Sequence, residues 1–470
     1  MGKYRSLIKD IFLFAISTFI PKAISFFLVP LYTNCLSTIE YGVADLISTT
    51  TSLIIPILTL DVNDGVMRFT IESKKDSRPL KIAIDWIIKS IILIFILLVI
   101  NDFFGFFPIE RYLATFFLLN YIAISFYGVL IAYIRAIDKV GLLSSISIIV
   151  SFVTIISNIL MLVVFNMGLF GYLFSGFIGY FIADIIICWK IKGTTIILGN
   201  KGIDKNLRKK MMKYSAPLVA ANISWWINSS SDKYIVTAMC GVKENGIYSI
   251  AYKIPTILQM LQSIFSQAWL LSVFREYKEK SGPQYVSNTY EMYYASMSIS
   301  CAALILLDIP MARFLYANDF FEAWKYVPFL LISVVFISYA GFFESILTLH
   351  KKSKIIAITT TIGAIVNIFL NFILINALGV IGAAIATMCG YLIVWITRIK
   401  PVMNEYYFKV NWVKQTILCV LLIMQAIALV VYKNYLWCVS FFITIVLLNV
   451  RIIMKIINSL KNRTSSLEGK

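Results

Sequence analysis

Four lysines lie inside long apolar segments of this 470-residue chain, where a charged side chain is unusual. An ionised group at the centre of a bilayer costs at least about 2.5–3.5 kcal/mol on insertion scales, so it is kept where it faces a cavity, a partner or the interface. Lysines that line a cavity would attract an anionic group such as a diphosphate. The candidate substrate-binding residues are therefore Lys22, Lys89, Lys233, Lys253 and, at the end of an apolar segment, Arg68.

Each of these cations could also be explained without a substrate, by reaching the membrane interface or a lipid headgroup, and the positions differ in how well that explanation fits. Lys22 follows Pro21 near the middle of its segment, where snorkelling explains a lysine least readily. Lys89 lies about eight residues from its segment end, where snorkelling and a functional role are about equally good explanations. Lys253 stands about two turns inside its segment, before a second proline. Arg68 is placed to touch lipid headgroups, with a phosphate contact as the functional alternative.

Five acidic residues also fall in or beside the apolar segments. One of them directly precedes Lys233 and can neutralise it. Two others close a segment, and two lie within a few turns of segment ends, where interfacial water can solvate them. As candidates for ion coupling or charge pairing we take Asp61, Asp64, Asp184, Asp232 and Glu344.

The composition indicates a chain whose solvent is lipid. The residues are 60% hydrophobic and 14% charged, and the mean hydropathy is +0.84, whereas soluble domains have about 25% charged residues. A membrane-spanning helix needs about 20 mostly apolar residues. We predict an all-α polytopic membrane protein with fourteen spans, at about 10–33, 42–61, 82–100, 112–134, 142–165, 169–189, 215–236, 247–271, 289–308, 326–349, 355–375, 380–397, 413–432 and 435–454.

The basic residues predict the orientation of these spans. Of the 42 Lys and Arg, 33 fall at the chain ends, in even-numbered connections or at the adjoining span ends (Lys414 and Arg451), five in odd-numbered connections and four deeper inside spans. Cytoplasmic loops collect Lys and Arg, so both termini are expected in the cytoplasm, with the protein in a bacterial cytoplasmic (inner) membrane. The basic, then apolar N-terminal segment lacks a small-residue cleavage pattern, and we expect it to remain as the first helix.

Two pairs of segments indicate an internal duplication. MGLFGYLFSGFIGYFI (167–182) and LGVIGAAIATMCGYLI (378–393) share three glycines, a tyrosine and an isoleucine without gaps, and EYGV (40–43) matches ENGI (244–247) at a similar offset. A unit of six helices crosses the membrane an even number of times, so its two copies are parallel. We expect a six-helix bundle at 1–200, a second at 201–400, and two additional helices with a cytoplasmic tail at 401–470.

The residue types for catalysis or metal binding are missing from the sequence. Its one histidine, His350, stands beside a lysine at a helix end, and its seven cysteines show no CxxC spacing. No Walker loop, dinucleotide fingerprint or nucleophile–histidine pair is found. We therefore expect no catalytic residue, no metal, no cofactor and no nucleic-acid partner: the chain would move a substrate and would not be an enzyme.

Several of these segments resemble a known family. SFFLVPLYT (25–33), EYG (40–42) and GVMRF (65–69) are similar to the opening of bacterial polysaccharide repeat-unit flippases, the O-antigen and capsule translocases of the multidrug/oligosaccharidyl-lipid/polysaccharide exporter (MOP) superfamily. SDK (231–233) and GIYSIAYK (246–253) resemble the start of that family's second half.

The resemblance implies two six-helix bundles around a V-shaped cavity that alternates between the two membrane faces. The implied substrate is an oligosaccharide linked to undecaprenyl diphosphate, moved from the cytoplasmic to the outer leaflet without ATP and with coupling to an ion gradient or the membrane potential. The implied partners are this lipid-linked oligosaccharide, membrane lipid, and a polymerase with other polysaccharide assembly proteins.

Other functions fit parts of the sequence. A multidrug or cation antiporter of the same superfamily typically has an acid in its first helix, yet none lies between Ile11 and Tyr32. A lipid II flippase shares the span number and a cationic cavity, and differs only in degree. A membrane glycosyltransferase or polymerase would need larger outer loops than the longest one, about 309–325, or acidic catalytic motifs. A scaffold without transport would have no use for lysines in the membrane.

Overall fold

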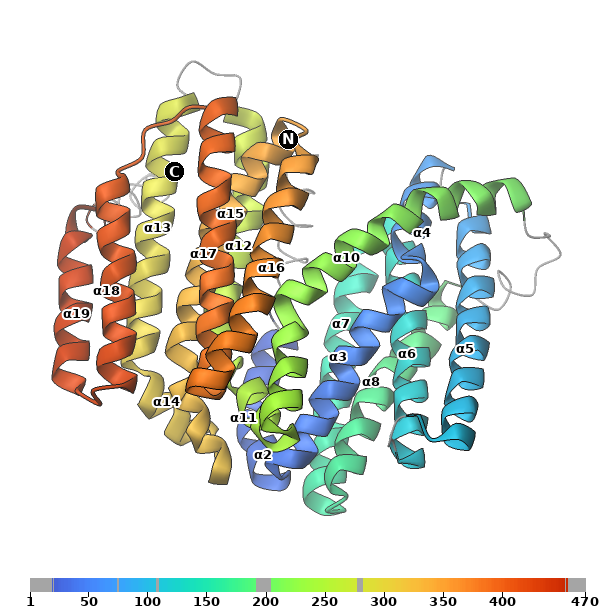
Figure 1. Cartoon of the computed structure of the whole chain (residues 1–470). Helices are drawn as coiled ribbons and strands as arrows, with labels where there is room; N and C mark the ends of the chain where they lie inside the picture. The colour runs from blue at the N-terminus through green and yellow to red at the C-terminus, as the bar shows by residue number, and fades with distance from the viewer. Residues whose placement is uncertain are drawn as a thin grey trace, which may run out of the picture. The chain divides into compact units, whose positions relative to one another are not determined.

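The computed structural model describes residues 19, 21–73, 76–106, 110–191, 204–276, 282–452 and 454, which form helices joined by short connections, with no strand among them (Figure 1). The chain divides into two compact units, Met1–Ser230 and Ser231–Lys470. This division lies inside the long helix α10 (Lys205–Cys240), whereas the duplication places it near residue 200. The three-part domain assignment remains a prediction.

The first unit contains the helices that precede α10 and the larger part of α10 itself. A helical stretch at residues 21–27 comes first, and the start of the predicted first span, residues 10–18, lies outside the described residues. The following elements are α2 (Val29–Cys35), α3 (Thr38–Thr59), α4 (Val62–Glu72), α5 (Arg78–Phe104), α6 (Arg111–Ala136), α7 (Val140–Asn158), the π-helical turn η1 (Ile159–Val164) and α8 (Gly168–Lys190).

The second unit contains the end of α10 and all later elements. They are α11 (Val242–Ala251), α12 (Pro255–Glu276), α13 (Gly282–Leu306), α14 (Asp308–Leu315), the 3-10 helix η2 (Asn318–Lys325), α15 (Val327–Leu349), α16 (Ser353–Leu378), α17 (Val380–Glu405), α18 (Trp412–Val430) and α19 (Tyr435–Leu448).

Within the described ranges, helices occur where the sequence predicts spans, and the polytopic all-α membrane fold is confirmed. Among the described residues, nine helices are long and apolar enough to cross a membrane, or ten if α13 and α14, bent by 59°, form one span. The nine are α3, α5, α6, α7 with η1, α8, α15, α16, α17 and α18. Helices α10 and α12 are long enough but more polar, and α19 is shorter.

Apolar side chains face outward along most of these helices, as expected for a protein dissolved in lipid. Helix α5 shows this clearly, because half or nearly half of the surface of consecutive large side chains is exposed: Ile92, Leu93, Phe95, Ile96 and Leu97. In water such a surface would drive aggregation. In a bilayer it is the ordinary solvent-facing surface.

Helix α15 is the exception, because it is enclosed by the other helices of the second unit. Of its apolar window, 78% is buried, and it contacts α12, α13, α16, α17 and α18. Phe336 stacks on Trp395 of α17 with ring centroids 6.0 Å apart, and Phe343 lies 5.1 Å from Tyr290 of α13. Helix α15 is therefore the core of the second unit.

The helix breaks at the end of one predicted span and inside another. The span predicted at 42–61 ends where Leu60 and Asp61 adopt left-handed backbone angles (φ 49° and 50°), and α4 follows directly. These angles close the end of α3 in a Schellman-type cap, in which the Asp61 amide donates to the Pro56 carbonyl at 3.0 Å. The predicted span 247–271 is likewise broken before Pro255, into α11 and α12.

The glycines of the predicted duplication have matching roles in the two units. Gly168 and Gly379 both have a positive φ, 52° and 66°. Gly168 is the first residue of α8, and Gly379 directly precedes α17. One turn later, a Cβ on Gly171 would lie 2.9 Å from Met161, and a Cβ on Gly382 would lie 2.2 Å from the carbonyl of Leu374. In each unit the start of the helix, α8 or α17, therefore packs closely against the end of the element before it. A glycine is needed there because a side chain would not fit.

We expect Gly382→Ala to destabilise the protein, because the alanine Cβ would overlap backbone atoms of Leu374. Backbone atoms cannot move aside by changing a side-chain rotamer. Overpacking of this kind costs about 1–3 kcal/mol, so the apparent unfolding temperature of the purified protein in detergent should fall. Gly141→Ala is the matched control, since a Cβ there meets nothing within 4 Å. Equal unfolding temperatures for the two variants would contradict the close packing of α16 and α17.

Candidate functional site

The ten candidate residues are distributed over both units, and each unit brings some of them together. The first unit contains Lys22, Asp61, Asp64, Arg68, Lys89 and Asp184, and the second contains Asp232, Lys233, Lys253 and Glu344. The groups differ mainly in whether their charge is compensated by a neighbour, and this distinguishes scaffold charges from charges that are available to a ligand.

Lys22 lies in the helical stretch 21–27, one residue after Pro21, and its side chain is half-buried. Within the described part of the chain it makes no ion pair. The role of Lys22 in substrate binding stays a prediction.

Lys89 has a different environment. Its ammonium forms an ion pair with Asp85 of the same helix at 2.7 Å, with 52% of the lysine side chain exposed. Asp85 also pairs with Arg208 of α10 at 3.5 Å, and the Arg208 guanidinium lies 4.9 Å from the centre of the Trp86 ring. Snorkelling is therefore not needed to explain Lys89, because a carboxylate one turn away compensates its charge.

Arg68 and the acids near it mark the broken span. Arg68 pairs with Glu72 at 2.8 Å and stacks over the Tyr214 ring at 4.3 Å, so it joins α4 to α10. Asp64 is exposed, whereas Asp61 is buried at the turn between α3 and α4, with Oδ2 lacking a hydrogen-bond partner among the described residues.

Asp184 lies in α8 and is half-buried. Its Oδ1 atom is buried and has no hydrogen-bond partner in the described part of the chain. The structure does not bring it together with any of the candidate lysines through a contact found among these residues.

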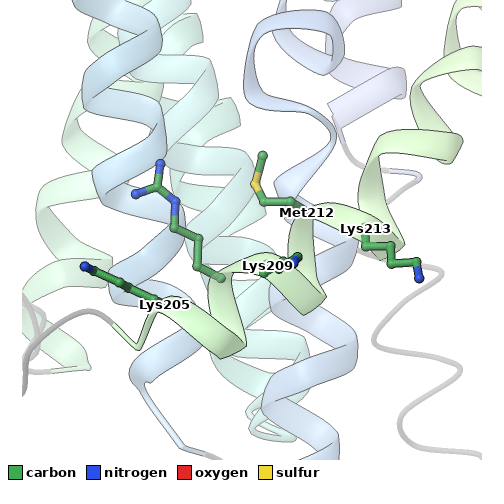
Figure 2. A pocket seen from close by; sticks show the side chains of 5 residues that line it. Lys205, Lys209, Met212 and Lys213 are labelled. Atoms are coloured by element: carbon green, nitrogen blue, oxygen red, sulfur yellow. The ribbon is translucent and has the colours of Figure 1, made fainter.

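A basic surface pocket lies at the start of α10. It has a volume of about 540 Å³ and is lined by Lys205, Arg208, Lys209, Met212 and Lys213. Figure 2 shows the lysines projecting from successive turns of the helix, which follows from their spacing of four residues. The sequence marked this stretch as basic and assigned it to topology alone.

In the second unit, Asp232 is the centre of a buried polar cluster. Its side chain is 2% exposed, and its Oδ2 atom accepts hydrogen bonds from the hydroxyls of Tyr248 and Tyr252, both at 2.6 Å, and of Thr387 at 3.1 Å. Four segments meet here, because Thr387 in turn accepts from Asn367 of α16 at 3.3 Å. The neutralisation of Lys233 by Asp232 stays a prediction, while the Asp232 carboxylate has partners up to 155 residues away.

The two lysines of this unit lie beside that cluster or next to one of its members. The Lys233 ammonium is 5.6 Å from the centre of the Tyr252 ring, a cation–π contact. Lys253 follows Tyr252 directly and stands at the break between α11 and α12, half-buried. Its side-chain position is set by the same break that presents the Tyr252 hydroxyl to Asp232.

The cluster has the ligand chemistry of a site for a proton or a hard cation. A carboxylate, three hydroxyls and the amide oxygens of Asn367 and Asn371 supply oxygen ligands, and the Asn371 Oδ1 atom is buried without a partner among the described residues. Hard cations prefer such oxygen sets. No group of three or more His, Cys, Asp or Glu suited to a metal occurs in the described ranges.

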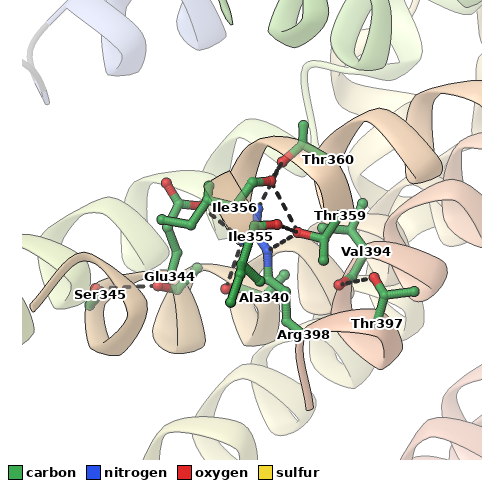
Figure 3. A network of polar contacts seen from close by, with 11 residues as sticks. Ala340, Glu344, Ser345, Ile355, Ile356, Thr359, Thr360, Val394, Thr397 and Arg398 are labelled. Carbon is green, nitrogen blue, oxygen red and sulfur yellow. Dashed lines mark hydrogen bonds and ion pairs between the residues drawn. The ribbon is translucent and has the colours of Figure 1, made fainter. Parts of the chain in front are cut away.

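Glu344 belongs to a network that the sequence did not reveal. Arg398 of α17 is 1% exposed, and its guanidinium donates to the Glu344 carboxylate at 2.8 Å, to the Ala340 carbonyl at 3.0 Å, and to the hydroxyls of Thr359 (3.1 Å) and Thr360 (2.8 Å). Figure 3 shows these partners converging on the guanidinium from α15 and α16. Arg398 therefore fastens three helices together.

This corrects the assignment of Arg398 to a cytoplasmic connection. The predicted span ended at residue 397, but α17 continues to Glu405 and carries the arginine inside the helix bundle. Glu344 was taken to be solvated at the interface, and its carboxylate is instead tied to a buried cation while 47% of its side chain stays exposed. A Thr-Thr-Thr run at 359–361 was the one available signal of polar partners.

Comparison with known proteins identifies what this arrangement resembles. Residues 7–270 match the family model described as polysaccharide biosynthesis protein. An uncharacterized membrane protein of Methanocaldococcus jannaschii is 27% identical over 252 residues, which cover 51% of this chain and 59% of that protein. The chain thus spans less than two thirds of that relative's length.

Solved structures show similarity of fold over most of the chain. A lipid II flippase in an inward closed conformation has a TM-score of 0.69 at 17% identity and covers 96% of this chain and 99% of its own. An inward-facing multidrug resistance transporter of the MOP superfamily has a TM-score of 0.62 at 11% identity, covering 86% and 98%. A MOP superfamily transporter from Pyrococcus furiosus, described by the reverse polarity of its binding pocket, has 0.57 at 13% identity, covering 84% and 96%.

Replacing Arg398 with Met should lower the stability sharply, because Glu344, two hydroxyls and a carbonyl would lose their donor. Removing one partner of a buried ion pair costs about 3–5 kcal/mol, although the half-exposed carboxylate will reduce this. Lys400→Met in the same helix is the control, since Lys400 is exposed. The apparent unfolding temperature in detergent is the measurement, and an Arg398→Met variant as stable as Lys400→Met would rule out the fastening role.

Proposed function

Because the chain belongs to the polysaccharide biosynthesis protein family, we propose that it is a flippase that moves a lipid-linked oligosaccharide across the membrane by alternating access. The matched residues, 7–270, cover more than half of the chain, and the family expected from the sequence is confirmed. Similarity of fold to a lipid II flippase over 96% of the chain supports the flippase proposal. The substrate we propose is an oligosaccharide repeat unit on undecaprenyl diphosphate, carried from the cytoplasmic to the outer leaflet.

The physical task of such a protein explains why lysines in the membrane would be useful. A diphosphate and its sugars cannot cross the hydrocarbon core unaided, since polar and charged groups lose their hydration there. The polyprenyl tail, in contrast, can remain in lipid throughout. A protein surface that supplies positive charge and hydrogen bonds to the headgroup removes the largest part of this barrier.

The environment of Lys22 is the main support for an anionic substrate. The lysine is half-buried in a helix, and no ion pair within the described residues accounts for it. Cation exporters of the same fold typically have an acid in the first helix, and none lies between Ile11 and Tyr32. Of the other candidate cations, Lys89 and Arg68 are paired with acids of their own helices, so we propose Lys22 as the principal headgroup contact and keep Lys233 and Lys253 as candidates.

The proposed orientation has both termini in the cytoplasm. Its support is the distribution of basic residues: once Arg398 is set aside, 32 lie at the chain ends, in even-numbered connections or at the adjoining span ends, against five in the odd-numbered connections. In this orientation the start of α10 lies toward the cytoplasmic side.

Substituting Lys22 with Ala or Glu should reduce surface polysaccharide at least tenfold in a strain that depends on this protein. A charge–charge contact at low effective dielectric is worth on the order of a few kcal/mol, and each 1.4 kcal/mol corresponds to about tenfold in rate. Lys22→Arg should retain export, and Lys139→Ala, in an exposed connection, is the control. The amount of folded protein in the membrane must be unchanged. Full export by Lys22→Glu would remove the case for this residue.

For the coupling of transport to an ion, we propose Asp232 among the five candidate acids. It is the one that lies at the centre of an oxygen-rich buried cluster, with two tyrosine hydroxyls and a threonine hydroxyl on one carboxylate oxygen. A proton or Na⁺ bound there would displace these hydrogen bonds and so alter the contacts among α10, α11, α16 and α17. Ion binding would then be linked to a change in helix packing.

Asp232→Asn should abolish stimulation of flipping by a Na⁺ or H⁺ gradient, because the amide keeps the shape but loses the charge. The measurement is the rate at which a fluorescent undecaprenyl-diphosphate disaccharide changes leaflet in proteoliposomes, with and without each gradient. Asp319→Asn is the matched control, since Asp319 pairs with Lys243 on an exposed segment. A folded Asp232→Asn protein that responds fully to the same gradient would contradict this role.

A further inference from the structure

The first turns of α10 are held in a fixed position against the first unit by polar contacts. Asp204 accepts hydrogen bonds from the amides of Asn206 and Leu207 at 2.9 and 3.0 Å, and its carboxylate lies 3.6 Å from Arg78 at the start of α5. Arg208 reaches Asp85 at 3.5 Å. Asp204, which directly precedes α10, and Arg208 in the first turn of α10 are therefore both held against α5.

Apolar contacts hold the opposite side of the same turns. Met211 is 1% exposed and belongs to the core formed by α4, α5, α6, α7 and α8, and Leu207 packs against that core. The segment is therefore an amphipathic surface helix that is docked along one side. Its other side must face the membrane surface or water.

That other side carries positive charge that the described residues leave uncompensated. Lys205, Lys209 and Lys213 are exposed and have no ion pair among the described residues, and they line the pocket of about 540 Å³ with Arg208 and Met212 (Figure 2). Like charges carried along one side of a docked helix repel each other, so an anion bound at this side reduces that repulsion.

We propose that this pocket binds the phosphate of an anionic lipid headgroup. Lysine ammonium groups are point-charge ligands for phosphate, and a basic amphipathic helix at a membrane surface is the usual recognition element for anionic lipids. Met212 supplies an apolar wall beside the cations, as expected for a ligand that continues into an acyl or prenyl chain. The binding of a lipid phosphate at this pocket does not depend on the proposed function.

Two lipids offer the same phosphate chemistry, and the probes distinguish them. One is bulk phosphatidylglycerol, and the other is undecaprenyl diphosphate. The purified full chain in neutral detergent is titrated with each lipid, and with phosphatidylcholine as a zwitterionic reference, and bound lipid is counted by native mass spectrometry. Tighter binding of phosphatidylglycerol assigns a bulk-lipid site, and tighter binding of undecaprenyl diphosphate assigns a site for the polyprenyl carrier. Both results support a lipid-phosphate pocket.

The decisive variant replaces the three pocket lysines, Lys205→Gln, Lys209→Gln and Lys213→Gln together. Its charge-matched control is Lys210→Gln, Lys354→Gln and Lys400→Gln, three exposed lysines of which the first is on the same helix but outside the pocket. We expect affinity for the preferred anionic lipid to fall at least tenfold in the pocket variant and less than twofold in the control.

Raising NaCl from 0.1 to 0.5 M should weaken binding to the unmodified protein, because the contact is electrostatic and exposed. This measurement needs no variant and so remains valid if the triple variant fails to fold. Equal binding of phosphatidylcholine, equal loss in the two triple variants, or binding that is insensitive to salt would each overturn the proposal. None of these results bears on flipping, which is measured separately.

Discussion

The free energy of placing a charge in an apolar solvent is the constraint on which this structure depends. Burying an ion is costly, and the cost is recovered only by a partner with good geometry. Arg398 meets this condition with four acceptors on two neighbouring helices, and Lys89 meets it with a carboxylate one turn away. Asp232 meets it with hydroxyls. Much of the polar architecture of both units consists of such compensation.

The degree of compensation separates structural charges from functional ones. Arg398 has nearly all of its donors engaged by protein, so it can offer little to a ligand without loosening three helices. Asp232 is engaged by hydroxyl groups, which can rotate to present oxygen in place of hydrogen when a cation arrives. Lys22 and the lysines of the pocket at the start of α10 have no ion pair among the described residues, which is why the proposals about anionic ligands rest on them.

Hydropathy and charge were enough to predict most of the fold. Long apolar segments located the helices, and the repeated glycines, taken as signs of a duplication, lie where α8 and α17 pack closely against the elements before them. The break between α3 and α4 was harder to predict, because a left-handed backbone is unusual for a residue such as Leu60. It closes the end of α3 through the hydrogen bond from the Asp61 amide to the Pro56 carbonyl.

The candidate site was predicted less completely, because its contacts join residues far apart in the sequence. The pair Asp85–Lys89 could have been read from its spacing of four residues. The partners of Asp232 could not, since Thr387 is 155 residues away and nothing local in either segment points to the other. Arg398 was missed because a hydropathy window ends a span at the first charge, although a helix can continue through an arginine that finds acceptors.

The enclosure of α15 has a consequence for how the protein is made. This helix is surrounded by α12 and α13, which are synthesised before it, and by α16, α17 and α18, which follow. A ribosome that has just delivered α15 to the membrane has therefore supplied only part of its surroundings. The second unit can close its core only after a further stretch of chain, through α18, has been inserted. Until then, the central helix of that unit has lipid, or an insertion chaperone, as its temporary neighbour.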